Sequence, residues 1–158
     1  MVYRIDPAEA SDRAAILALV PRLRAFGEVP LRAGAALDAG ERRTLNGFFE
    51  HPSPGAQLWV ARADAGTLLG FAYAEVALDY FTREPHGHLG ILALSESAQG
   101  QGIGRALVNE VEAWARRNAF RFVTLSVFAG NEHAREFYER LDFRVDTLRY
   151  IKALDGSD

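Results

Sequence analysis

The segment Gln99-Gly100-Gln101-Gly102-Ile103-Gly104-Arg105-Ala106-Leu107 decides the fold, because it joins two different hydrophobic patterns. Before it, His88 to Leu94 is an apolar run typical of a strand covered on both faces. After it, Ile103 to Asn118 carries apolar residues at helical spacing. The alternating glycines permit positive φ angles and close approach of a ligand, and a helix start supplies unpaired N–H groups. We therefore expect this turn to bind an anion such as phosphate.

The turn differs from two familiar phosphate-binding motifs. A P-loop requires a lysine directly after its second glycine, and the only lysine in the chain is Lys152. The dinucleotide fingerprint requires its third glycine three residues after its second, where this chain has Arg105 or Leu107. A tight turn that binds nothing would use glycine in the same way. The turn alone leaves both interpretations open.

A second motif follows the strand predicted over Arg121 to Phe128. It is Asn131-x-x-Ala134-x-x-Phe137-Tyr138-x-x-Leu141-x-Phe143, and Asn131 is a suitable N-cap for a helix with this apolar face. Together with Gln99-x-x-Gly102-x-Gly104, this motif resembles the GNAT superfamily of acetyl-CoA-dependent N-acetyltransferases. The resemblance covers roughly Leu68 to Phe143, and the order of elements along the whole chain is similar to that fold.

The resemblance implies an acetyl-CoA site. The strand ending at Leu94 would present backbone groups to the acetyl and pantetheine parts, and the glycine turn would wrap the pyrophosphate. Asn131 would hydrogen-bond the pantetheine arm. The superfamily usually has arginine where this chain has Gln99, which leaves one charge fewer on the phosphates. The implied cofactor-binding residues are Leu92, Ala93, Leu94, Gln99, Gly100, Gln101, Gly102, Ile103, Gly104, Arg105, Ala106, Asn131, Ala134, Phe137 and Tyr138.

Tyr138 is the candidate general acid. By the resemblance it would lie near the sulfur, where it could protonate the departing CoA thiolate. A tyrosine on the apolar stripe of a helix is also typical of a core residue with a bonded hydroxyl. The sequence leaves both roles open.

The general base is less well defined. Direct transfer needs a neutral amine, yet an amine with a pKa of ~10.4 is mostly protonated at pH 7, so a base or a water chain must accept a proton. The diamine and polyamine branch, which Gly70 to Tyr73 resembles, typically has carboxylates at the positions of Gly90 and Ile91. Both are absent here. The remaining candidates are His88, Glu75 and a water chain.

Composition excludes several other classes. The 158 residues include no cysteine, which excludes a disulfide scaffold, a thiolate zinc site and a cysteine nucleophile. His86 and His88 could share a strand face but have no evident third ligand, so we expect no metal. A net charge of −3 argues against nucleic acid and anionic lipid as partners. Without an apolar leader or a run of about 18 apolar residues, the expected location is cytoplasmic.

The remaining patterns predict one domain over residues 1–158. We expect an α/β (α+β) fold with a mixed, mostly antiparallel sheet, splayed to admit CoA and covered by helices on both faces. Gly27 to Gly40 is expected to be a loop, and Arg144 to Leu154 one or two closing strands. Pro21 should kink or end the first helix.

The predicted function is transfer of the acetyl group of acetyl-CoA to a primary amine of a small molecule. Two alternatives stay open: a CoA-binding regulatory or sensor domain without turnover, and a protein or peptide N-acetyltransferase. The sequence does not identify the amine, and it leaves a homodimer open.

Overall fold

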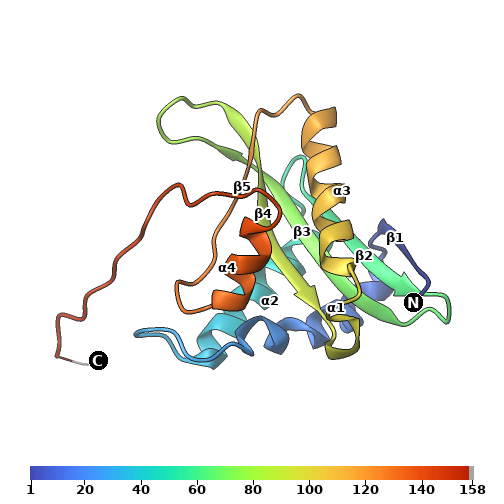
Figure 1. Cartoon of the computed structure of the whole chain (residues 1–158), viewed down its shortest axis with the longest axis horizontal. Helices are drawn as coiled ribbons and strands as arrows, with labels where there is room; N and C mark the ends of the chain where they lie inside the picture. Colours follow the sequence, from blue (N-terminus) through green and yellow to red (C-terminus); the bar gives the residue numbers. More distant parts are fainter. Residues whose placement is uncertain (157–158) are drawn as a thin grey trace.

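The computed structural model describes residues 1–156 and arranges them around a five-stranded sheet in the order β1-β2-β3-β4-β5 (Figure 1). The first four strands pair antiparallel and β5 pairs parallel to β4, which confirms the predicted mixed sheet. The strands are β1 Tyr3–Pro7, β2 Gln57–Ala63, β3 Leu68–Leu78, β4 Pro85–Leu94 and β5 Val123–Leu125.

Helices cover both faces of this sheet, as predicted (Figure 1). On one face α3 forms the crossover from β4 to β5, because parallel neighbours need a long connection. On the other face lie the N-terminal helices. The helices are α1 Arg13–Ala18, α2 Gly34–Glu50, α3 Ile103–Arg117 and α4 Glu132–Glu139, with 3₁₀ turns η1 Ala10–Asp12, η2 Val20–Arg24 and η3 Glu96–Ala98.

The core has two layers because side chains alternate across the strands. Ala72 on β3 faces α3 and packs with its apolar stripe, whereas the neighbouring Phe71 faces α1 and α2. Leu107 on α3 and Leu45 on α2 are fully buried. Each contributes about 2 kcal/mol relative to an exposed position.

The N-terminal half agrees with the sequence analysis in one feature and differs in another. Helix α1 ends at Ala18 and a 3₁₀ turn containing Pro21 follows, which confirms the predicted break. The loop expected over Gly27 to Gly40 is wrong from Gly34 onward, because α2 begins there. Packing of Leu45 against the sheet outweighs the poor helix propensity of the glycines.

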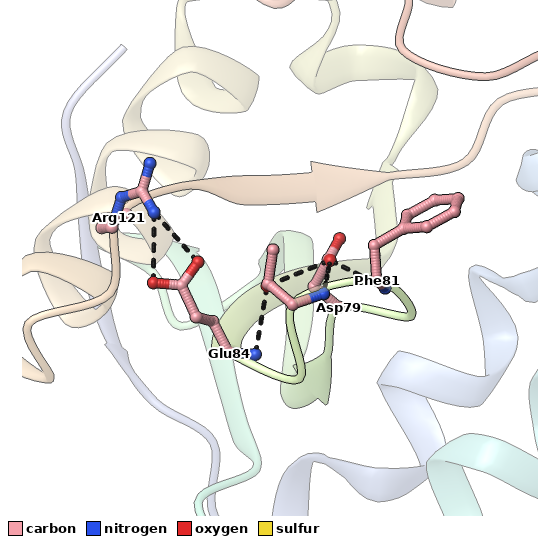
Figure 2. Close-up of polar contacts among 5 residues, drawn as sticks. Asp79, Phe81, Glu84 and Arg121 are labelled. Atoms are coloured by element: carbon pink, nitrogen blue, oxygen red, sulfur yellow. Dashed lines mark hydrogen bonds and ion pairs between the residues drawn. The ribbon is translucent and has the colours of Figure 1, made fainter.

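The β3–β4 hairpin holds the start of β4 in place. Asp79 Oδ1 accepts hydrogen bonds from the backbone N–H groups of Phe81 and Thr82 at 3.0 and 2.8 Å (Figure 2). Glu84 pairs with Arg121 at 2.9 Å and so ties the hairpin to the chain entering β5 (Figure 2). The parallel register of β4 and β5 is fixed at this end of the sheet.

The C-terminal predictions are partly wrong. The strand expected over Arg121 to Phe128 is reduced to β5, and the strands expected over Arg144 to Leu154 do not form in the described residues. Residues 144–152 are instead exposed and leave the body of the protein after α4 (Figure 1). One edge of β5 is therefore without a partner strand in the described part of the chain.

Candidate functional site

Strands β4 and β5 separate halfway along β4. Their ladder joins Gly87, His88 and Leu89 to β5, whereas β4 continues to Leu94. The separation begins where the β3–β4 pairing skips Gly90, between the pairs Ala74–Leu89 and Tyr73–Ile91. Such a bulge increases local twist and turns the end of a strand away from its neighbour. The backbone of β4 beyond Leu89 is thus unpaired on the β5 side, as the predicted splay requires.

A cavity of about 140 Å³ occupies the separation. One wall comes from β4, the chain after β5, and α4; the other comes from η2 and α2. Residues far apart in the sequence therefore meet at one place. The lining residues are Leu23, Arg24, Leu37, Asp38, Glu41, Leu89, Gly90, Ile91, Leu92, Ser126, Val127, Phe128, Asn131, Ala134 and Tyr138.

The glycine turn before α3 leaves a row of backbone donors free. Gly100 and Gly102 have φ angles of +73° and +77°, and a Cβ added at either would meet no atom within 4 Å. The first hydrogen bond of α3 runs from Ala106 N to Gly102 O at 3.1 Å. Within the described chain, no N–H group of residues 100–105 donates to another group. The turn has the donors and the open space that a phosphate requires.

Gly104 brings three predicted cofactor-binding elements into contact. A Cβ built there would lie 3.2 Å from Phe137 Cζ and 3.4 Å from Leu94 Cδ1. The first turn of α3, the end of β4 and the middle of α4 therefore converge around this glycine. A larger side chain would push them apart.

Helix α4 presents Asn131 and Tyr138 to the cavity. Asn131 Oδ1 accepts a hydrogen bond from Ala134 N at 3.2 Å, as an N-cap does, and its amide N–H groups are free to donate. The Tyr138 ring packs against Phe137 and Phe143, and burial raises its pKa to about 12. Its hydroxyl makes no hydrogen bond within residues 1–156, unlike that of an ordinary core tyrosine.

The two base candidates from the sequence lie outside this cavity. His88 Nδ1 is 2.8 Å from Thr124 Oγ1, and burial lowers the pKa of His88. Glu75 accepts a hydrogen bond from the Tyr73 hydroxyl at 2.9 Å. Glu75 lines a second cavity, of about 260 Å³, against the C-terminal half of α2. Glu75 and His88 lie opposite each other in the β3–β4 register, but each side chain has another partner: Tyr73 for Glu75 and Thr124 for His88.

Two carboxylates that the sequence analysis missed line the β4–β5 cavity from α2. Asp38 forms a bidentate pair with Arg24, with N···O distances of 2.9 and 3.1 Å. Glu41 has no hydrogen-bond or ion-pair partner among the described residues, and burial raises its pKa. The Asp38-x-x-Glu41 spacing places both on one helix face, but this pattern has meaning only where the segment is helical, and Gly34 and Gly40 favour a loop there.

The packing around Gly90 accounts for the missing carboxylates on β4. A Cβ at Gly90 would lie 3.0 Å from Tyr73 Cδ1, a tight contact that requires the tyrosine ring to shift by a few tenths of an ångström. Ile91 is only 4% exposed and packs in the core below α1 and α2. A carboxylate at either position would conflict with this packing.

Neither a metal-binding cluster nor a membrane-crossing helix is found in the described part of the chain. No group of three or more His, Cys, Asp and Glu side chains is placed to hold an ion within residues 1–156. Over the same residues, each helix is too short or too polar to span a bilayer.

Comparisons with known proteins agree with this geometry. Residues 28–143 match the model of the acetyltransferase (GNAT) family. Mycothiol acetyltransferase of Propionibacterium freudenreichii subsp. shermanii is 31% identical over 77% of the chain, and that of Rhodococcus erythropolis is 31% identical over 82%. The chain covers only 37% and 44% of these two relatives. A solved structure, described as a putative acetyl transferase from Pyrococcus furiosus, superposes with a TM-score of 0.79 at 21% identity. The match covers 97% of this chain and 100% of the Pyrococcus chain.

Proposed function

Because the chain belongs to the acetyltransferase (GNAT) family, we propose that it transfers the acetyl group of acetyl-CoA directly to a primary amine of a small molecule. The observation that carries this proposal is the β4–β5 cavity, which is lined by unpaired residues of β4, by Tyr138 and by Glu41. Acetyl-CoA supplies an activated acetyl thioester and a thiolate leaving group. The residues of the chain bind and orient acetyl-CoA and the amine, and they move protons.

The glycine turn is the proposed phosphate site. The free N–H groups of residues 100–105 would bind the pyrophosphate oxygens at the positive end of the α3 dipole. Arg105 is exposed in the first turn of α3 and can add a charge-assisted bond. The open space at the Cβ positions of Gly100 and Gly102 fits a phosphate close to the backbone.

The pantetheine arm would follow the free side of β4. Its amides resemble a peptide backbone, so they can pair with the unpaired N–H and C=O groups of Leu92, Ala93 and Leu94. The Asn131 amide can donate to the arm from the other side, while Ala134 and Phe137 line its path. A backbone N–H near Leu94 could then polarise the thioester carbonyl.

Glu41 is the proposed base. A carboxylate without a partner in a partly closed cavity attracts a cationic amine, and the same burial that raises its pKa makes it a better proton acceptor. Asp38 adds negative charge one helical turn away, although Arg24 offsets part of it. His88 and Glu75 are the alternatives that the sequence suggested, and a water chain could connect either to the cavity.

Tyr138 is the proposed donor to the leaving thiolate. A hydroxyl whose pKa is raised to about 12 stays protonated throughout the neutral range and can hydrogen-bond to a thiolate. Because a thiolate has a pKa of roughly 8.5, complete proton transfer from such a tyrosine is uphill. Its role is therefore to stabilise negative charge on sulfur as the bond to the acetyl group breaks.

The cavity volume favours a small acceptor. The cavity is about 140 Å³, and its wall from α2 carries the carboxylates of Asp38 and Glu41, which suit a protonated amine before transfer. The test is release of CoA thiol from acetyl-CoA against a panel of amines and N-terminal peptides. The panel includes the unacetylated form of mycothiol, because two relatives are named mycothiol acetyltransferases.

The protein adds no background to this assay, because the chain contains no cysteine to react with a thiol reagent. The mycothiol precursor is itself a thiol, so its acetylation is followed by mass spectrometry instead. Saturable thiol release with a small amine, and mass spectrometry showing one added acetyl group, is the expected result. CoA binding without turnover on any amine would assign the chain to a sensor role. Turnover with peptides alone would assign it to protein acetylation.

A further inference from the structure

The β4–β5 cavity also contains a cation that the proposed transfer does not use. Arg24 is the only cationic side chain among the described residues, 1–156, that line this cavity. Asp38 accepts hydrogen bonds from Arg24 Nε and Nη2 at 2.9 and 3.1 Å. Gly34, the first residue of α2, makes room for the same side chain, because a Cβ there would lie 3.1 Å from Arg24 Cδ. The guanidinium is thus held in one place before any ligand binds, which lowers the entropy cost of binding.

One edge of this guanidinium is unused. The Asp38 carboxylate occupies the edge formed by Nε and Nη2. The N–H groups of Nη1, and the second N–H group of Nη2, donate to no acceptor within residues 1–156. Together they form the other edge of the fork, which matches the two oxygens of a second carboxylate. The cavity therefore offers a site for an anion as well as for a cation.

The cation site is Glu41, whose carboxylate has no hydrogen-bond or ion-pair partner among the described residues. Glu41 follows Asp38 by one helical turn, and side chains at this spacing have Cβ atoms about 5–6 Å apart. Arg24 is paired with Asp38 and not with Glu41, so opposite charges face the cavity a short distance apart. An amino acid carries an ammonium and a carboxylate a few bonds apart, so one molecule can meet both charges.

We propose that the acceptor is an amino acid, whose carboxylate binds the free edge of Arg24 while its amine meets Glu41. This inference rests on the proposed acetyl transfer and names the class of its acceptor. The bound ammonium first loses a proton to Glu41. The amine nitrogen then forms a bond to the acetyl carbon, the C–S bond breaks, and a second amine proton ends on the sulfur. The products are an N-acetyl amino acid and CoA, and the carboxylate at Arg24 is unchanged. Asp38 is a positioning residue that holds Arg24.

The same charges disfavour an acceptor with two amines. Arg24 and Asp38 offset each other, which leaves Glu41 as the net charge of this wall. Inside a cavity of about 140 Å³, a short diamine with one ammonium at Glu41 would bring the other near Arg24, and like charges repel. An amino acid meets each of the two groups with the opposite charge. Arg24 therefore selects for the carboxylate and against a second amine.

The first test compares acceptors that differ only at the carboxylate. Leucine, leucinamide and isopentylamine share a side chain and a primary amine, and matching sets are made for alanine, glutamate and phenylalanine. Acetylation is measured by mass spectrometry. The best amino acid should have a kcat/KM about 10- to 100-fold higher than its amide, the factor that one hydrogen bond to a charged group contributes. The amide has the less basic amine, so more of it is neutral at pH 7, which biases the comparison against this result. Equal values for acid and amide in every set overturn the proposal.

A double variant, Arg24→Gln with Asp38→Asn, removes the fork and leaves no unpaired charge behind. Its ratio of kcat/KM, amino acid to amide, should approach one. This ratio is the readout because a variant that folds poorly loses both activities together. The control, Arg13→Gln with Glu50→Gln, removes a 2.6 Å ion pair at the other end of α2, and its ratio should equal that of the wild-type chain. If the Arg24 and Asp38 variant keeps the wild-type ratio, Arg24 is only part of a structural ion pair and the proposal is wrong.

Binding to the CoA-loaded chain separates this inference from the proposed function. Calorimetry measures each amino acid and its amide against chain saturated with CoA, in which no transfer can occur. Tighter binding of the amino acid, lost in the Arg24 and Asp38 variant, supports the site even where no acceptor is turned over, and acetyl transfer is then the part that fails. Turnover of amines without preference for a carboxylate keeps acetyl transfer and overturns the amino acid. Equal binding of acid and amide in every set also overturns it.

Discussion

Replacing Gly102 by valine tests whether the turn before α3 binds phosphate. Gly102 has a φ of +77°, and the space around its Cβ position is open. Valine there meets no protein atom but imposes the strain of a left-handed conformation, roughly 1–2 kcal/mol. For a chain of this size we expect the melting temperature to fall by about 2–8 °C. The fold should survive this loss.

The effect on CoA binding should be much larger. The valine side chain would occupy the space in which a phosphate approaches the N–H groups of residues 100–105. A hydrogen bond to a charged group contributes about 1.5–3 kcal/mol, so the loss of two weakens binding by about 3 kcal/mol. At about 1.4 kcal/mol per factor of ten, that is roughly 100-fold in Kd. Titration calorimetry with CoA measures it directly.

Gly66 provides a matched control. It has a φ of +88°, equally open surroundings, and a place in the β2–β3 turn outside the cavity. Gly66→Val should lose similar stability and keep the affinity of the wild-type chain for CoA. If Gly102→Val binds CoA within threefold of wild type, or if Gly66→Val loses as much affinity, the phosphate site is assigned to the wrong turn.

Three further predictions concern single side chains. Tyr138→Phe removes the donor that stabilises charge on sulfur, so it should lower kcat by about 100-fold or more in steady-state assays. The KM for acetyl-CoA should be nearly unchanged, and near-full kcat would make Tyr138 a packing residue. The profile of kcat/KM against pH should have an acidic limb, along which activity falls as pH drops through the raised pKa of Glu41. Glu41→Gln should remove this limb. If His88→Asn or Glu75→Gln removes it instead, that residue is the base. The buried carboxylate of Asp12 lies 2.6 Å from Arg62, and the hydrogen bond between them lowers the pKa of Asp12. The stability that this pair adds is therefore present above the unfolded pKa of about 3.9 and is lost as pH falls through the folded pKa. Urea unfolding at pH 7 should show Asp12→Asn less stable by about 2–3 kcal/mol, and this difference should shrink below pH 4; an unchanged difference at pH 3 would contradict the assignment.

The parts of the fold that the sequence predicted are those with strong local patterns. The stripe of Ile103, Leu107, Val111 and Trp114 has one period, and α3 begins at the predicted residue and ends one residue early, at Arg117. The hairpin strands β2 and β3 flank Asp64 to Gly66, residues whose turn chemistry is visible in the local sequence. Asn131 caps α4 as predicted.

The failures occurred where distant contacts outweigh local preference. Nothing local predicts a helix from Gly34, since Gly34 and Gly40 disfavour it; the helix is held by Leu45 against Val60 and Phe71. Conversely, residues 144–154 have strand propensity, but a strand forms only when it is paired, and in the described chain these residues leave the sheet after α4. Only the helix brings Glu41 to the cavity, so local sequence does not mark it as a site residue.

The absence of carboxylates on β4 and the presence of Glu41 on α2 follow from one packing arrangement. The Tyr73 ring lies where a side chain at Gly90 would project, and its hydroxyl is held by Glu75. A side chain at Gly90 would crowd this ring, whereas the opposite wall of the β4–β5 cavity already holds two carboxylates, those of Asp38 and Glu41. That wall is α2, whose Phe48 packs edge-on against Tyr73 at 6.0 Å and fixes the helix against the sheet. The same tyrosine ring thus hinders a base at Gly90 and packs against the helix that supplies Glu41.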